Sequence, residues 1–196
     1  MQNEKFIPQR GIYRCKNNGV TLVELIIVIS IIGILVIALG FSFEGWIGKY
    51  RVEGQIKEMH SDLMNTRANA MSRSRVHFFI FPNATSYTIY DDDSNGAIKV
   101  PDGDGTLQPG TGVTADTQLP GFPKTVPDTL IWAGGNIEFS TRGIIQPLAT
   151  PLGGTICAFT AFDPDYDCIV ISQTRINMGK ITNQLGNCDA ANCVVK

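Results

Sequence analysis

An apolar stretch near the N-terminus limits the architectures open to this chain. Leu25–Phe43 is nineteen residues long and contains no charged side chain. At about 1.5 Å of rise per residue, a helix of this length just crosses a hydrocarbon core about 30 Å thick. Because a helix satisfies its backbone hydrogen bonds internally, we expect the stretch to be a helix that spans a membrane.

The residues on either side of the apolar stretch carry charge in an unusual pattern. Glu24 stands at its entrance, where an ionisable side chain is costly to keep and marks a candidate functional position. Four basic residues precede it: Lys5, Arg10, Arg14 and Lys16. This basic excess predicts a cytoplasmic N-terminus and a domain on the other side of the membrane. Because 41–46 offers no good cleavage site, an ordinary secretory signal peptide is disfavoured.

The sequence from Gly19 to Glu24, Gly-Val-Thr-Leu-Val-Glu, precedes an Ile/Leu/Val-rich run with Gly33 inside it. This arrangement resembles the class III signal of type IV pilins and pseudopilins. The resemblance implies that prepilin peptidase cuts between Gly19 and Val20 at the inner membrane and methylates the new terminal amine. It also implies that Glu24 pairs with the terminal amine of a neighbouring subunit during assembly, since a buried carboxylate is tolerable when a cation partners it. Val20 departs from the Phe or Met usual in the family.

This reading divides the chain into three parts. Residues 1–19 are a leader, 20–45 a transmembrane and assembly helix, and 46–196 a periplasmic domain. Four of the 16 basic and one of the 18 acidic residues fall in the leader, so the chain from Val20 onward has a formal charge near −5. That balance is not typical of a general nucleic-acid binder.

The cysteines agree with an exported domain. Cys15 lies in the leader, whereas Cys157, Cys168, Cys188 and Cys193 lie in the domain and predict two disulfides. Pairing Cys157 with Cys168 and Cys188 with Cys193 is the local choice, but four cysteines allow three connectivities and the sequence selects none. Zinc is disfavoured because there are no Cys-x2-Cys pairs and neither histidine is near.

Beyond the membrane the helix is predicted to continue to about Arg75. Its apolar positions follow the spacing of one face of an amphipathic helix, which we expect to pack on the domain's own sheet. These positions are Val52, Ile56, Met59, Leu63 and Ala70, with Thr66 between the last two.

After Arg75 the residue pattern changes to that of strands. Residues rich in β-branched and aromatic types predict strands, with a turn at Pro82-Asn83 between the first two and a long loop over 91–127. The predicted strands are Val76–Phe81, Ser86–Tyr90, a short one at Ala97–Val100, Thr129–Trp132, Asn136–Ser140, Thr155–Phe162 and Cys168–Thr174. The fold class is therefore α+β, type IV pilin-like, with a long N-terminal helix packed on an antiparallel β-sheet.

Three blocks of residues carry a closer resemblance. In this order they are similar to the GspH/FimT family, the minor pseudopilins of type II secretion and minor pilins of type IV pili. The resemblance implies a structural subunit, a minor pilin or pseudopilin, that assembles with other subunits in the inner membrane. The blocks are Leu63-x3-Arg67-Ala68-x-Ala70-x2-Arg73, Ile137-x-Phe139-Ser-Thr-Arg142-Gly143, and Ile169-Val-Ile-Ser172 followed by Gly179-Lys180-Ile181.

One acidic stretch matches a calcium-loop pattern. Asp91, Asp93 and Asn95 occupy positions 1, 3 and 5, and Asp102 occupies position 12, with a glycine at position 6. Oxygen side chains at this spacing converge on a hard cation. A plain turn between strands is the alternative, favoured by Pro101 and by aspartate rather than glutamate at position 12.

Enzymatic function has little support, because the nucleophile, phosphate-loop and zinc-protease motifs are absent from the sequence. We therefore expect a non-enzyme. DNA binding is the alternative of a different class, since some members of the resembling family are implicated in DNA uptake through basic residues near the C-terminal strand. The available positions are Arg142, Arg175, Lys180 and Lys196. So few scattered cations on an acidic chain predict weak phosphate binding.

Overall fold

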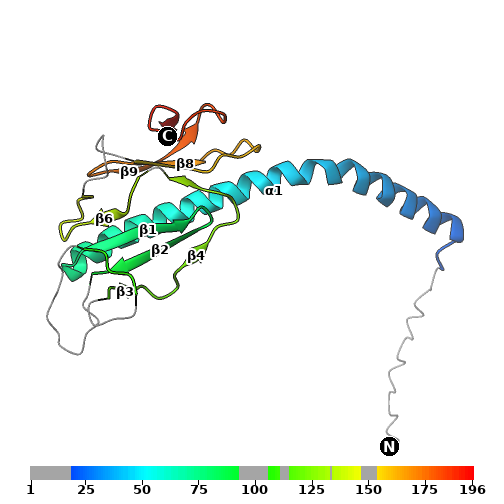
Figure 1. Cartoon of the computed structure of the whole chain (residues 1–196). Helices are drawn as coiled ribbons and strands as arrows, with labels where there is room; N and C mark the ends of the chain where they lie inside the picture. The colour runs from blue at the N-terminus through cyan, green and yellow to red at the C-terminus, as the bar shows by residue number, and fades with distance from the viewer. Residues whose placement is uncertain (1–18, 93–105, 111–114, 133, 147–153) are drawn as a thin grey trace, which may run out of the picture. The chain divides into compact units, whose positions relative to one another are not determined.

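A computed structural model describes residues 19–92, 106–110, 115–132, 134–146 and 154–196, except for the side chains of 38–44. In this part of the chain, one long helix, α1 (Leu22–Arg73), is followed by a series of strands (Figure 1). The strands are β1 (His77–Asn83), β2 (Ser86–Asp91), β3 (Thr117–Gln118), β4 (Lys124–Thr125), β5 (Ile131–Trp132), β6 (Ile137–Phe139), β7 (Gly154–Cys157), β8 (Cys168–Ile171), β9 (Ile176–Ile181) and β10 (Cys193–Val195). The predicted α+β class is confirmed. The chain divides into two compact units, Met1–Phe43 and Glu44–Lys196.

The apolar stripe of α1 packs as the sequence predicts. All six positions of the stripe are buried: Val52, Ile56, Met59, Leu63, Thr66 and Ala70. The apolar members join a core with Phe79 and Tyr87, whose rings stack 5.0 Å apart. Tyr87 also donates a hydrogen bond from its hydroxyl to Asp62 Oδ2 at 2.7 Å. The C-terminal half of α1 is therefore an integral part of the second unit's core.

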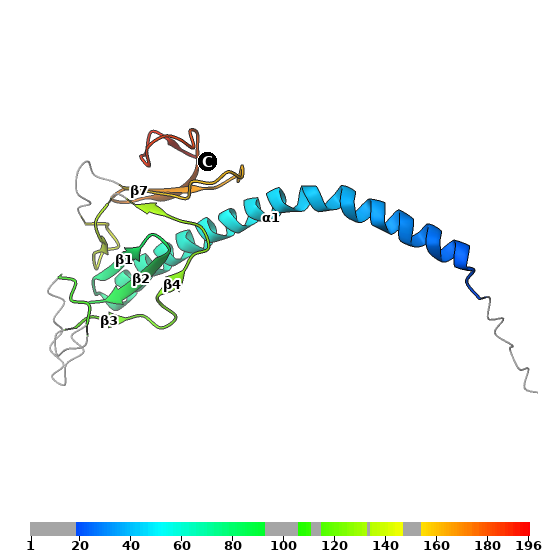
Figure 2. The same cartoon turned by 45° about the vertical axis from the view of Figure 1, so that its right-hand side comes forward.

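The strands form two antiparallel sheets, not the single sheet that the sequence predicts. The first has the order β3-β2-β1-β6, with β4 also paired to β2, and the second has the order β10-β9-β8-β7-β5. Figures 1 and 2 both show the two sheets on different sides of the C-terminal half of α1. Side chains of both sheets enter the same core, among them Ile137 and Ile169. Both sheets therefore pack against the same helix, and a stripe pattern alone does not reveal the second sheet.

Strand boundaries differ from the prediction at the turns and at the C-terminus. Asn83 ends β1, and the turn falls at 84–85, because the Asn83 side-chain oxygen accepts a hydrogen bond from the Thr85 backbone N–H at 2.9 Å. β9 and β10 were not predicted as strands, and β7 is shorter than predicted. The short strands β3 and β4 fall within 91–127, which was predicted to be one long loop, because each pairs with β2 over only two residues. The predicted strand at Ala97–Val100 lies outside the described residues.

The disulfides join partners distant in the sequence. Cys157 bonds Cys188 and Cys168 bonds Cys193, with Cα atoms 5.8 and 6.1 Å apart. Two disulfides are thus confirmed, while the local pairing is wrong. Cys157 and Cys168 do stand directly opposite each other on β7 and β8. However, the Cβ atoms of opposed residues are typically about 4.5–5.5 Å apart, farther than a disulfide favours.

The C-terminal segment, residues 182–196, lies over the face of the second sheet that turns away from α1 (Figures 1 and 2). The cysteines form a separate buried cluster there with Ile181. Beside it, the fully buried carboxylate of Asp167 accepts hydrogen bonds from the Ile181 backbone N–H and from Gln184 Nε2. Burial raises the pKa of Asp167. Both disulfides therefore fasten this segment across the sheet.

We expect the double variant Cys168→Ser, Cys193→Ser to lose stability. The bond has a sequence separation of 25 residues, and a loop of that size corresponds to about 3 kcal/mol on the chain-entropy model. The urea midpoint of the full chain in detergent measures the loss. Cys15→Ser is the matched control, because Cys15 lies in the predicted leader. An unchanged midpoint in the double variant would show that the bond contributes nothing.

Two glycines of α1 are expected to respond oppositely to alanine. A Cβ at Gly48 would lie 2.5 Å from the Phe162 ring, whereas a Cβ at Gly54 would meet nothing within 4 Å. Alanine is the better helix former by up to about 1 kcal/mol, so Gly54→Ala should raise the free energy of unfolding. Gly48→Ala should lower it, because the ring must leave its place on the helix. Denaturant unfolding of both variants measures the difference, and equal effects would contradict the packing of Phe162.

Candidate processing and assembly site

The predicted processing site lies just before the helix. Gly19, Val20 and Thr21 are exposed and non-helical, and α1 begins at Leu22. Thr21 caps the helix: its Oγ1 accepts a hydrogen bond from the Glu24 backbone N–H at 3.2 Å, and its carbonyl accepts one from the Leu25 N–H. This is half of the Thr-x-x-Glu capping box, a signal present in the sequence that the sequence analysis missed. The cap keeps the Gly19–Val20 bond outside the helix.

Gly19 has no structural reason to be glycine. A Cβ added at this position would meet nothing within 4 Å, and its backbone is not in the left-handed region. The chain's own packing would therefore accept a larger residue. A requirement for glycine at this position would therefore come from a partner of this segment and not from the fold of the chain.

Glu24 lies in the first turn of α1 and is exposed. A carboxylate is favourable there because the helix dipole places partial positive charge at the N-terminus. Within the described residues, Glu24 makes no ion pair with another side chain. It is also the only charged residue from Val20 to Phe43. Its charge is thus available to a cation from outside the described chain.

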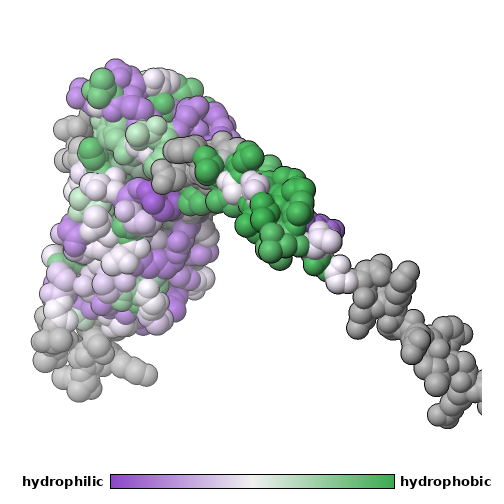
Figure 3. All heavy atoms as spheres, turned by 90° about the vertical axis from the view of Figure 1, so that its right-hand side faces the viewer, coloured by the Kyte–Doolittle hydropathy of each residue, from purple (hydrophilic) through white to green (hydrophobic). Residues whose placement is uncertain are grey.

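The helix after Glu24 exposes apolar side chains all round. Its large side chains from Leu25 to Ile37 are each about half exposed or more, for example Ile29 at 56% and Ile37 at 66%. Ser30 is the polar exception, and its hydroxyl donates to the Ile26 carbonyl at 2.7 Å. Figure 3 shows this continuous hydrophobic surface. A surface of this kind marks contact with lipid or with other proteins.

In the part of the chain that the structure describes, no helix meets the length and hydropathy needed to cross a membrane. The predicted span runs to Phe43, and the side chains of 38–44 lie outside the described set.

Comparison with family models identifies the N-terminal region. Residues 14–40 match the prokaryotic N-terminal methylation motif. The match contains Gly19, Val20 and Glu24 together with most of the exposed apolar helix, and it supports a type IV pilin-like protein. The motif indicates a subunit of the pilin or pseudopilin kind that assembles with other such subunits after processing by prepilin peptidase. Comparison with curated proteins and with solved structures finds no match.

The predicted calcium ligands fall mostly outside the described residues. Asp93, Asn95 and Asp102 lie there, and among the described residues no group of three acidic, histidine or cysteine side chains is placed to hold a metal. Asp91 ends β2, buried, and its Oδ2 accepts a hydrogen bond from Arg73 at 2.8 Å. Burial lowers the pKa of the adjacent His77, and the positive charge nearest to the Asp91 carboxylate is the Arg73 guanidinium. Among the described residues, the other Asp91 oxygen has no hydrogen-bond partner. Calcium binding stays a prediction.

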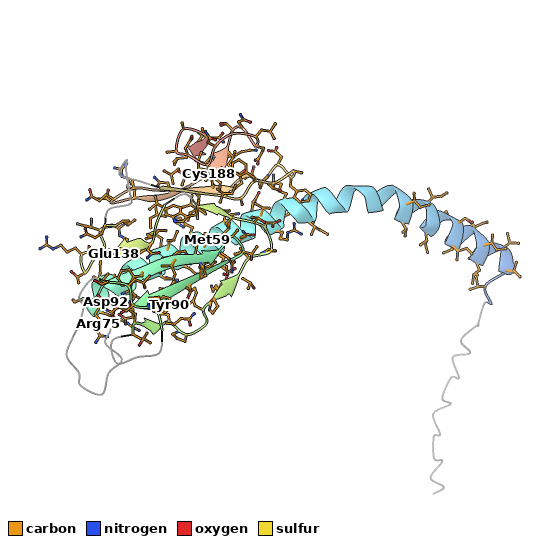
Figure 4. All side chains as sticks on the ribbon, viewed as in Figure 1. Met59, Arg75, Tyr90, Asp92, Glu138 and Cys188 are labelled. Atoms are coloured by element: carbon orange, nitrogen blue, oxygen red, sulfur yellow. A yellow bond between two sulfur atoms is a disulfide. The ribbon has the colours of Figure 1, made fainter. Side chains whose placement is uncertain are left out.

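The same end of the domain holds the start of the acidic loop. Arg75 and Asp92 lie there (Figure 4), and the Asp92 backbone N–H donates to the Val76 carbonyl at 3.0 Å. Arg75 also approaches Asp91, with an Nη1–Oδ2 distance of 3.8 Å. Asp91, the first residue of the calcium-loop pattern, is therefore contacted by one arginine of α1 and by one arginine of the segment that follows α1.

The predicted DNA-binding residues do not form one group. Arg142 and Arg175 are exposed. The side chain of Arg67 contacts the sequence neighbours of both. Its Nη1 donates to the Thr174 carbonyl at 2.9 Å, and its side chain lies beside Gly143. Lys180 lies five residues beyond Arg175 along β9, about 16 Å away at the rise of a strand. It forms an ion pair with Asp163, whose hydrogen bond raises the pKa of Lys180. The sequence analysis did not include Arg67 among the candidate DNA-binding residues.

Proposed function

We propose that this protein is a minor pilin or pseudopilin of the GspH/FimT kind, a structural subunit of a type IV pilus or a type II secretion pseudopilus. One observation carries the proposal. An apolar helix, exposed on all sides and bearing a single carboxylate in its first turn, begins three residues after an exposed glycine within a matched N-terminal methylation motif. A non-catalytic role is part of the proposal.

The proposed mechanism has two stages. After synthesis the subunit resides in the inner membrane, with a cytoplasmic N-terminus and residues 46–196 in the periplasm, and lipid covers the apolar side chains. Prepilin peptidase then removes residues 1–19 and methylates Val20. On assembly, helices of neighbouring subunits replace the lipid. Glu24 pairs with the terminal amine of a neighbour, and this pairing sets the axial register because an unpaired carboxylate in an apolar bundle is costly.

The membrane stage has a direct test. We expect the full chain to stay with inner membranes through an alkaline carbonate wash. We also expect protease added to spheroplasts to degrade the domain without access to the cytoplasm. A variant lacking 22–43 is the matched control and should appear in the wash. Recovery of the complete chain in the wash would contradict the membrane stage.

DNA binding remains the second candidate, and the arginines at one end of the domain are the observation that favours it. Arg67 bonds the carbonyl of Thr174, next to Arg175, and lies beside Gly143, next to Arg142, whereas Lys180 forms an ion pair with Asp163. A salt-dependent shift of duplex DNA that is lost in Arg142→Ala, Arg175→Ala and kept in Lys180→Ala would support it. The absence of any shift at low salt would remove it.

A further inference from the structure

Two turns of α1 just beyond the apolar stretch expose a small aromatic cluster. Trp46, Ile47 and Tyr50 are 58%, 56% and 54% exposed. The rings of Trp46 and Tyr50 meet edge to face with centroids 4.8 Å apart. Both belong to the unit Glu44–Lys196, and Trp46 is the third residue after Phe43, about 4.5 Å further along the helix axis. We call Trp46, Ile47 and Tyr50 the aromatic cluster.

The opposite face of the same turns is covered by the domain. Gly48 packs under the Phe162 ring, and Val52 is fully buried. A helix advances about 100° per residue, so the aromatic cluster points away from these contacts. The domain therefore buries the face of α1 that carries Gly48 and Val52. The aromatic cluster, on the other face, has no packing partner outside the cluster among the described residues.

The cations of these turns are already engaged within the domain. Lys49 lies 3.4 Å from Asp165, and Arg51 makes two hydrogen bonds to Asp128, at 2.8 and 2.9 Å. By contrast, neither the Trp46 indole N–H nor the Tyr50 hydroxyl bonds another group in the described chain. The cluster thus offers large apolar rings together with polar atoms that bond no other group of the described chain, and its attraction to a partner does not depend on a free positive charge.

We propose that the aromatic cluster is an interfacial anchor, which seats in the headgroup region of the bilayer while the subunit is in the membrane. Tryptophan and tyrosine gather at membrane interfaces because their rings favour the apolar side and their polar atoms favour the wet side. A dry contact with a second protein would bury the indole N–H and the hydroxyl at a cost unless each found a partner. The wet headgroup layer satisfies both. The anchor fixes the depth of the helix before assembly, and this inference rests on the proposed membrane stage.

Depth-dependent quenching of tryptophan fluorescence tests the anchor. The chain has two tryptophans, so the difference between wild type and Trp46→Phe isolates the signal of Trp46. The full chain is inserted into phosphatidylcholine vesicles whose acyl chains carry bromine either near the headgroup or near the terminal methyl. We expect bromine near the headgroup to quench the Trp46 signal more strongly. The Trp46→Phe protein, which retains Trp132, should lose little fluorescence with either lipid.

Three results would overturn the anchor, and the first two of them leave the proposed membrane stage standing. Absence of quenching in vesicles that retain the protein through a carbonate wash would place Trp46 in water and refute the anchor alone. Stronger quenching by bromine near the terminal methyl would place it in the hydrocarbon and also refute the anchor. Release of the protein by the wash would refute both the anchor and the membrane stage on which it rests.

Discussion

Glu24→Leu is expected to leave membrane insertion intact and to abolish incorporation into the filament. The substitution removes the only charge between Val20 and Phe43, so it makes the helix more apolar and favours residence in lipid. On the proposed pairing, it leaves a neighbour's terminal ammonium without its partner in the assembled state. Removing one member of a buried ion pair costs about 3–5 kcal/mol, which corresponds to a loss of incorporation of about two to four orders of magnitude.

The measurement compares the variant in membranes and in sheared filaments by immunoblot. Ser30→Ala is the matched control, because Ser30 lies on the same helix and its hydroxyl bonds, among the described residues, only the Ile26 carbonyl. We expect this control to assemble at the wild-type level. Wild-type incorporation of Glu24→Leu would refute the role of the carboxylate.

Gly19→Leu is expected to block processing completely, so that the 19-residue leader stays attached. The substitution costs the fold nothing, since a side chain at Gly19 would meet no atom within 4 Å. A processing defect would therefore report recognition by the peptidase rather than damage to the subunit. Intact mass after co-expression with prepilin peptidase measures the outcome.

Gly33→Ala is the control for this experiment. A Cβ at Gly33 also meets nothing within 4 Å, and the residue lies inside α1, away from the processing site. We expect this control to be trimmed normally. Normal trimming of Gly19→Leu would show that the glycine is not part of the signal.

The helix was predictable because its signals are local. The stripe from Val52 to Ala70 follows helical spacing, and the structure buries every member of it. The motif from Gly19 to Glu24 is likewise contiguous, and an independent family model matches it. Such features depend on residues a few positions apart, so one sequence contains them in full.

The second sheet and the disulfide connectivity depend on contacts between distant residues. Cys157 and Cys168 are neighbours across β7 and β8, yet each bonds a cysteine of the C-terminal segment that folds over the sheet. β9 was missed because Asn177, Gly179 and Lys180 interrupt its apolar residues. Lys180 was grouped with distant arginines because the sequence does not reveal its ion pair with Asp163.

The central claim is that the apolar N-terminal helix is kept in the mature subunit and mediates its assembly with other subunits. Mass spectrometry of the protein's N-terminus in purified filaments, or in the pseudopilus fraction, tests this claim most directly. The account predicts a chain that begins with N-methylated Val20 and retains residues 22–43. A mature chain that begins downstream of Phe43 would contradict it.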